Sequence, residues 1–178
     1  IFLEDGRILA YRDPRRFGQF DILNKTTIDK DKRFKDLGPD PVIDKSFTAE
    51  YLFQECKKRK TSIKSLIMNQ QIVVGVGNIY ANEALFKAGI RPDRLAGKIS
   101  KARLARLVEC IKLVLAAAIK QGGTTLKDFV GGDGKPGYFK QELAVYGRAN
   151  KACVACGTTL KEVRQAQRST VFCSKCQS

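Results

Sequence analysis

The first residues of the chain alternate short apolar runs with turn signals, a pattern that is typical of β-strands. Ile1–Leu3 and Ile8–Tyr11 flank Glu4–Arg7, whose Asp-Gly pair is a strong signal for a hairpin turn. Gly18–Leu23 predicts a further strand after a turn-like stretch. Because the chain begins inside a hairpin and lacks an initiator methionine, we expect these residues to be the tail of a longer domain.

The apolar period changes farther along the chain. Residues 24–45 are charged and broken by prolines, which predicts a linker. From 46 to 123 apolar residues recur every three or four positions, as in amphipathic helices. The helical pattern is interrupted at Gly75–Asn78. Gly89 predicts the end of one helix, and Ser100 predicts the cap at the start of the longest helix.

Composition and charge exclude several classes of protein. The 178 residues are 43% hydrophobic and 29% charged, as in globular proteins, and a net charge of +15 favours a polyanionic partner. No apolar run approaches the roughly 20 residues that span a bilayer, and the start lacks the features of a secretory signal, so we expect a cytoplasmic protein. The absence of histidine excludes His-based triads and metal sites with imidazole ligands.

Four of the six cysteines form two pairs near the end of the chain. Cys153-x2-Cys156 and Cys173-x2-Cys176 are separated by 16 residues, a spacing that is typical of a four-cysteine zinc site. A dithiol redox centre and disulfides are the alternatives. Four protein ligands would close the coordination shell, so the zinc would be structural, and Thr158–Phe172 would form a hairpin between the pairs. Cys56 and Cys110 are interpreted as buried thiols.

Basic residues cluster in three places. The cysteine module has one acid, Glu162, against six basic residues, which favours nucleic-acid contact, with a protein-docking ribbon as the alternative. Lys57–Lys60, with Lys64 one turn later, favours phosphate contact over a merely solvated helix end. Asp13–Gly18 combines cations with an aromatic residue that could act as a wedge in a DNA groove, but alone it favours an ordinary turn with a core phenylalanine.

Gly75–Asn78 precedes a helix, where backbone N–H groups could bind a phosphate, although the motif alone is weak. Six motifs occur in order along the chain, in addition to the cysteine pairs: Asp13–Gly18, Leu37–Pro41, Val74–Ala81, Gly122–Phe129, Asp133–Phe139 and Gln167–Thr170. Together, these motifs resemble those of the bacterial formamidopyrimidine-DNA glycosylase family, which removes oxidised purines from DNA. The sister family, endonuclease VIII, differs in the region 122–139 and after the arginine of the zinc hairpin, so the oxidised-purine branch is favoured.

The resemblance implies an α+β protein in three parts. Residues 1–45 would be the remnant of an N-terminal β-sandwich plus a linker. Residues 46–146 would be a helix–two-turn–helix DNA-binding domain with a loop, 124–139, that closes over the damaged base. Residues 147–178 would be a zinc β-hairpin holding one structural Zn²⁺. The implied partner is double-stranded DNA that contains an oxidised purine or an abasic site, bound by a monomer.

The resemblance also implies roles for individual residues. Arg15 and Phe17 would fill the gap that is left when the damaged nucleotide is flipped out of the duplex, which the chemistry requires. Arg168 would both bind phosphate and assist the final elimination step. The phosphate clamp around the flipped nucleotide would consist of Arg59, Lys64, Asn78 and Arg168.

The nucleophile of the family is an N-terminal proline amine, assisted by a glutamate and a lysine in the N-terminal half. Neither Ile1 nor Glu4 matches these residues. We therefore expect the full-length protein to be a bifunctional glycosylase and AP lyase that works by β,δ-elimination, and this chain alone to be inactive. The alternatives are a non-catalytic DNA-binding module and a ribosomal or docking zinc ribbon.

Overall fold

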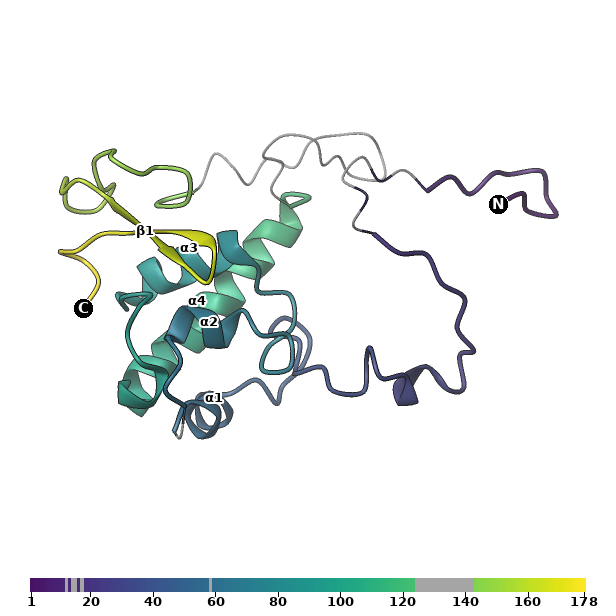
Figure 1. The fold of residues 1–178 in the computed structure, drawn as a ribbon, viewed down its shortest axis with the longest axis horizontal. Helices are drawn as coiled ribbons and strands as arrows, with labels where there is room; N and C mark the ends of the chain where they lie inside the picture. Colours follow the sequence, from purple (N-terminus) through teal and green to yellow (C-terminus); the bar gives the residue numbers. More distant parts are fainter. Residues whose placement is uncertain (12, 14–15, 17, 58, 124–142) are drawn as a thin grey trace. The chain divides into compact units, whose positions relative to one another are not determined.

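The structure is a computed structural model that describes residues 1–11, 13, 16, 18–57, 59–123 and 143–178. The chain divides into two units, Ile1–Lys35 and Asp36–Ser178. The α-helices of the second unit are labelled in Figure 1. The second unit contains both the helices and the cysteine module. The division at residues 45 and 146 stays a prediction.

The first unit has little regular structure. The predicted hairpin turn is present, since Phe2 and Ile8 form an antiparallel bridge around Gly6, whose φ is +81°. The predicted strand Gly18–Leu23 is wrong, because no strand is assigned in the described part of this unit. A strand needs a neighbouring backbone to pair with, and among the described residues of the unit only Phe2 and Ile8 pair. The 3₁₀ helix η1, Ile28–Lys30, was not predicted.

Side-chain caps and a glycine bound the helices of the second unit, and Ser100 and Gly89 do so as predicted. The hydroxyl oxygens of Thr48, Ser62 and Ser100 accept hydrogen bonds from backbone N–H groups three residues later and cap three of the helices. Gly89 ends another in the left-handed conformation, with φ +71°. The elements are α1 (Ala49–Cys56), α2 (Ile63–Ile67), α3 (Asn78–Ala88), the 3₁₀ helix η2 (Ala96–Lys98) and α4 (Lys101–Lys120).

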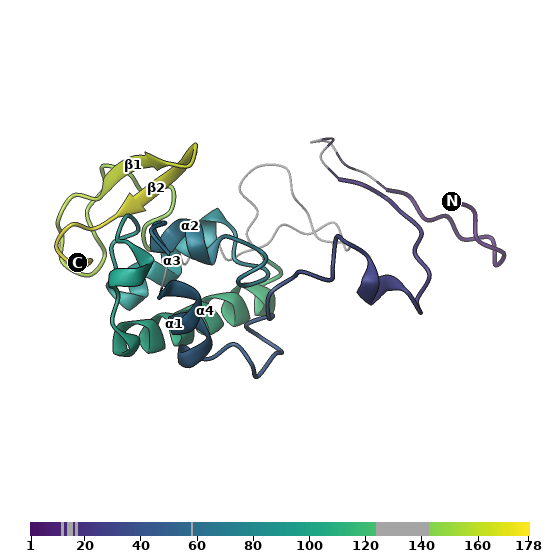
Figure 2. The ribbon, with the colours of Figure 1, turned by 60° about the horizontal axis from the view of Figure 1, so that its bottom comes forward.

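The core of this unit lies where α4 packs against α1 and α3 (Figures 1 and 2). Each fully buried leucine, isoleucine or phenylalanine contributes about 1.5–3 kcal/mol, so this packing carries the stability of the helices. Cys56 and Cys110 are both buried, as predicted, and burial raises the pKa of Cys56 to about 11. The largest buried side chains include Phe47, Leu52, Ile67, Leu85, Leu104, Leu107 and Ile111.

The predicted hairpin of the cysteine module consists of β1 (Lys161–Gln165) and β2 (Arg168–Phe172), which pair antiparallel. Gln165 pairs with Arg168 across a two-residue turn at 166–167, and both turn residues have positive φ, +44° and +61°. Such a turn matches the twist of the strands. β2 packs against α3 (Figure 2), so the hairpin is joined to the helical part of the unit through its second strand.

Candidate nucleic-acid interface

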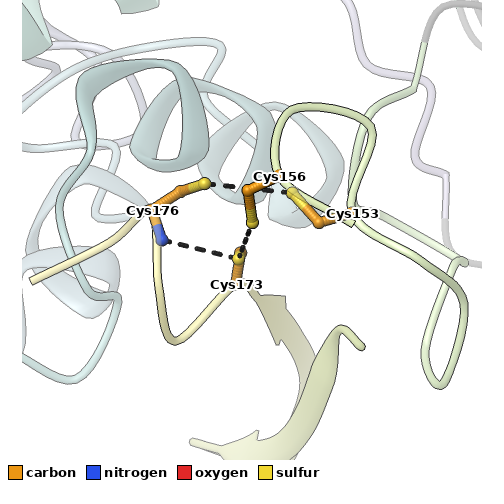
Figure 3. A group of neighbouring side chains, drawn as sticks. All are labelled: Cys153, Cys156, Cys173 and Cys176. Carbon is orange, nitrogen blue, oxygen red and sulfur yellow. Dashed lines mark hydrogen bonds between the residues drawn. The ribbon is translucent and has the colours of Figure 1, made fainter. Parts of the chain in front are cut away.

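The four paired cysteines come together at the base of the hairpin, with their side chains pointing toward one another (Figure 3). All four Sγ atoms lie within 4.8 Å of one another, with 4.0 Å between Cys153 and Cys176 and 3.5 Å between Cys156 and Cys173. A tetrahedral zinc ion with Zn–S bonds of about 2.3 Å requires sulfur–sulfur distances of about 3.8 Å. The donor set therefore fits one structural Zn²⁺.

The electrostatics of the cluster also favour a cation. Hydrogen bonds from Thr158 lower the pKa of Cys156 to about 6, so this thiol is ready to act as a thiolate ligand. Sharing its proton with the sulfur of Cys156, together with burial, raises the pKa of Cys176. A divalent cation would take the place of such shared protons and bind all four sulfurs as thiolates.

Lys64, predicted to bind phosphate, is buried with only 2% of its surface exposed. Its Nζ donates to the hydroxyl of Thr170 at 2.7 Å and to the backbone carbonyl of Ser169 at 3.0 Å. An ammonium has three donors, so one remains for another acceptor. Burial and the positive charge of Arg168 lower the pKa of Lys64 to about 8. The lysine thus joins α2 to the start of β2.

Asn78 reaches the same point of the hairpin from the first residue of α3. Its Nδ2 donates to the carbonyl of Ser169 at 3.1 Å, which is also an acceptor for Lys64. The backbone N–H groups at the start of α3 lie beside this contact, and Asn78 is half-buried. A helix N-terminus with a side-chain amide and a buried ammonium forms a positive environment that suits an anion.

Arg168 and Arg59 have different surroundings. Arg168 is exposed at the tip of the hairpin, directly before the residues that Lys64 and Asn78 hold. Arg59 follows α1 and forms an ion pair with Glu55 at 2.8 Å. The structure therefore brings Lys64, Asn78 and Arg168 to one place, and it records no contact between Arg59 and these three. Arg15, Phe17 and the loop 124–139 lie outside the described residues.

Two buried polar residues of α3, which the sequence did not single out, fasten the cysteine module and the segment 144–146 just before it to the helices. The carboxylate of Glu83 accepts from three successive backbone N–H groups, those of Ala144, Val145 and Tyr146, at 2.8–3.0 Å. Asn82 accepts from the backbone N–H of Val171 in β2 at 2.8 Å. Both side chains are at most 2% exposed. A buried carboxylate is stable only with such a set of donors.

The sequence contained a signal for these anchors. Ile79 and Phe86 are seven positions apart, and Asn82 and Glu83 lie between them at the third and fourth positions. Those spacings place the four residues on one helical face. Polar residues on an apolar face indicate buried polar contacts, because an unpaired polar group there would be costly.

Two family models match the chain. The model described as the formamidopyrimidine-DNA glycosylase H2TH domain matches residues 37–130, and the zinc finger found in FPG and IleRS matches residues 150–178. The helices and the cysteine hairpin described above fall within these ranges. A helix–two-turn–helix domain followed by such a zinc finger defines a class of DNA-repair glycosylases.

Individual relatives agree with the family models. Formamidopyrimidine-DNA glycosylase of Marinomonas sp. (strain MWYL1) is 70% identical, over 99% of this chain and 64% of its own length. The crystal structure of the MutM (Fpg) protein of Thermus thermophilus is 38% identical, with a TM-score of 0.84 over 93% of this chain and 62% of that one. The complex of Lactococcus lactis Fpg with abasic-site DNA is 31% identical, with a TM-score of 0.75 over 81% and 52%.

The chain belongs to the formamidopyrimidine-DNA glycosylase family. It spans a little under two thirds of the length of the curated relatives that it matches, 64% and 65% for two of them. Among the described residues, no helix is long and apolar enough to cross a membrane.

Proposed function

We propose that these 178 residues form the DNA-binding part of a glycosylase that removes oxidised purines from DNA and then cleaves the abasic site as a lyase. Family membership supports this proposal, together with relatives that were solved in complex with abasic-site DNA and with Fapy-dG DNA. The net charge of +15 suits a polyanionic partner. We further infer a monomer in the bacterial cytoplasm.

The observation that carries the proposal is the convergence of Lys64, Asn78 and Arg168 at the hairpin tip. Lys64 and Asn78 both donate to the carbonyl of Ser169, which fixes the backbone that presents Arg168. We assign to these three residues the binding of a backbone phosphate, which would receive hydrogen bonds from the Arg168 guanidinium, the remaining donor of Lys64 and the second N–H of the Asn78 amide.

The zinc ion would act through this geometry. Its chemical contribution is to hold the two cysteine pairs together, since all four ligand positions come from the protein. The hairpin between the pairs then stands at a fixed angle to α3, and Asn82 and Glu83 keep it there. A rigid arginine loses less conformational entropy on binding than a mobile one, which favours phosphate affinity.

The remaining roles follow from the resemblance. We propose that Arg15 and Phe17 occupy the gap left by the flipped nucleotide, that Arg59 contributes to the phosphate contacts, and that residues 124–139 cover the damaged base. Arg168 would also assist the final elimination, because a cation beside the departing phosphate stabilises its charge. The resemblance assigns imine formation to a proline amine in the N-terminal half of the family, so we propose that these 178 residues bind DNA without cutting it.

Binding and trapping experiments on the 178-residue polypeptide test this proposal. A duplex with an abasic-site analogue should bind more tightly than an intact duplex of the same sequence. With about six phosphate contacts, the logarithm of the affinity should fall against the logarithm of salt concentration with a slope of about −5. Equal affinity for both duplexes would reduce the function to general DNA binding. A covalent adduct trapped by borohydride would contradict the assignment of the nucleophile to another part of the protein.

A further inference from the structure

A second basic surface lies at the opposite end of α3 from Asn78. An open cleft of about 730 Å³ is bounded by the last turn of α3, the first turns of α4 and the two cysteine pairs. We call it the α3–α4 cleft. The residues that determine its chemistry are Phe86, Lys87, Ala102, Arg103, Arg106 and Ala155.

The cations of the cleft are not paired with acidic side chains. Lys87, Arg103 and Arg106 form no ion pair within the described part of the chain, and no aspartate or glutamate lines the cleft. Arg103 donates to the carbonyl of Gly89 at 2.8 Å and to the backbone oxygen of Ser178 at 2.6 Å, and Arg106 donates to the carbonyl of Lys87 at 3.2 Å. These bonds orient both guanidinium groups, and among the described residues the charges of Lys87 and Arg106 face no carboxylate. The site therefore presents fixed positive charge to an incoming anion.

Apolar residues line the cleft together with these cations. Phe86, Ala102 and Ala155 line the same cleft, and both alanines are exposed. A row of phosphates would satisfy the cations but would leave this apolar surface without a partner. A peptide that carries carboxylates on both sides of one aromatic or aliphatic residue would satisfy both.

We propose that the α3–α4 cleft binds an acidic segment of a partner protein that contains an exposed apolar residue. The cleft is separate from the proposed phosphate clamp, since Lys87 lies nine residues after Asn78 along α3. At a rise of about 1.5 Å per residue, the two positions are about 14 Å apart. The protein could therefore hold DNA at one end of α3 and a partner at the other.

Because Ala155 and Cys176 both line the cleft, its wall depends on the folded zinc module. Loss of zinc should abolish binding of the acidic segment as well as weaken DNA binding. This dependence distinguishes the cleft from a basic patch on α4 alone, which would keep its affinity when the cysteine module unfolds.

Fluorescence anisotropy with a labelled peptide, Asp-Asp-Phe-Asp-Asp, tests the proposal on the 178-residue protein. Arg106→Glu should weaken binding about tenfold or more, because it replaces a charge-assisted contact with repulsion. Lys120→Glu makes the same charge change at the other end of α4 and should alter the affinity less than about twofold, as expected for a distant screened charge. Lys87→Gln provides a second cleft variant if Arg106→Glu lowers the helix content in circular dichroism.

Two further binding measurements show which chemical groups of the ligand the cleft recognises. Replacing the phenylalanine of the peptide with serine should weaken binding about fivefold, through loss of apolar burial. A saturating abasic-site duplex should leave the peptide bound. The proposal is overturned if the peptide does not bind, if cleft and control variants lose affinity equally, or if the serine peptide binds as well. Displacement of the peptide by the duplex would assign the cleft to phosphate.

Discussion

The helical part of the second unit and its cysteine module are stabilised by different means, although they pack side by side. The helices share a continuous apolar core, which includes most of the large buried side chains. The apolar cluster of the module is much smaller: it consists of Cys153, Leu160, Val171 and Cys173, with Val145 just before the module, and two of these residues are metal ligands. Apolar burial is therefore sufficient for the helices, whereas the module requires zinc and buried polar contacts.

Removing a zinc ligand should show most clearly that the two regions are stabilised by different means. Cys173→Ser should release the metal and unfold residues 147–178, because metal binding supplies the folding energy of a module with so little core. The helices should remain, since their core does not involve the cysteine pairs. Metal analysis and circular dichroism of the same sample measure both effects. Full zinc retention by Cys173→Ser would show that the module is held by other contacts.

A large-to-small change in the helical core should have the complementary effect. Leu104 is completely buried, so Leu104→Ala should lower the free energy of unfolding by about 2–5 kcal/mol. Under native conditions the zinc content should stay at one per chain, because the ligands are untouched. Denaturant unfolding and metal analysis test this pair of outcomes. A loss of zinc in the folded Leu104→Ala protein would mean that the core and the metal site are one cooperative element.

Replacing Glu83, whose buried carboxylate lies between the two regions, should destabilise the protein less than removing a zinc ligand or truncating a core leucine. Glu83→Gln replaces one acceptor oxygen with a donor that faces backbone N–H groups, which should cost about 1–3 kcal/mol. Glu109→Gln changes the same charge on the exposed face of α4 and serves as the control. Limited proteolysis within 147–178 should increase for Glu83→Gln only. If both variants behave alike, the three hydrogen bonds of Glu83 are not the anchor that we infer.

A further expected effect is a dependence of stability on pH. Burial and Arg168 lower the pKa of Lys64 from 10.5 to about 8 in the folded protein. Between these pH values the unfolded chain keeps a proton that the folded chain has released, so this group makes the folded state more stable as pH rises. Lys64→Met removes the contribution. The stability of the wild type relative to Lys64→Met should increase from pH 8 to pH 10. A difference in stability that stays constant over this range would mean that the pKa of Lys64 is not lowered in the folded protein.

The sequence predicted the helical part well, because local signals and tertiary packing agree there. The Ser100 cap and Gly89 are each recognisable without knowledge of the rest of the fold. The cysteine spacing similarly predicted the ligand set and the hairpin between the pairs. The strand expected at Gly18–Leu23 is wrong because an alternating pattern does not provide the neighbouring backbone that a strand needs.

The site was harder to predict than the fold. Lys64 was singled out as one of a run of cations, but its burial and its bonds to Ser169 and Thr170 join residues more than a hundred positions apart. Glu83 was not singled out, although its position on an apolar face carried a signal. Contacts between distant segments depend on how α2, α3 and β2 pack together, and no local pattern encodes that geometry.

The central claim is that the zinc-held hairpin presents Arg168 to a DNA phosphate. Affinity for an abasic-site duplex, measured for Arg168→Ala and Arg164→Ala, tests it most directly, because both arginines are exposed on the same hairpin and neither is a metal ligand. The account predicts a loss of about 1–3 kcal/mol in binding for Arg168→Ala, as for a charge-assisted hydrogen bond, with a much smaller loss for Arg164→Ala and unchanged zinc in both. Equal affinities for the two variants would contradict it.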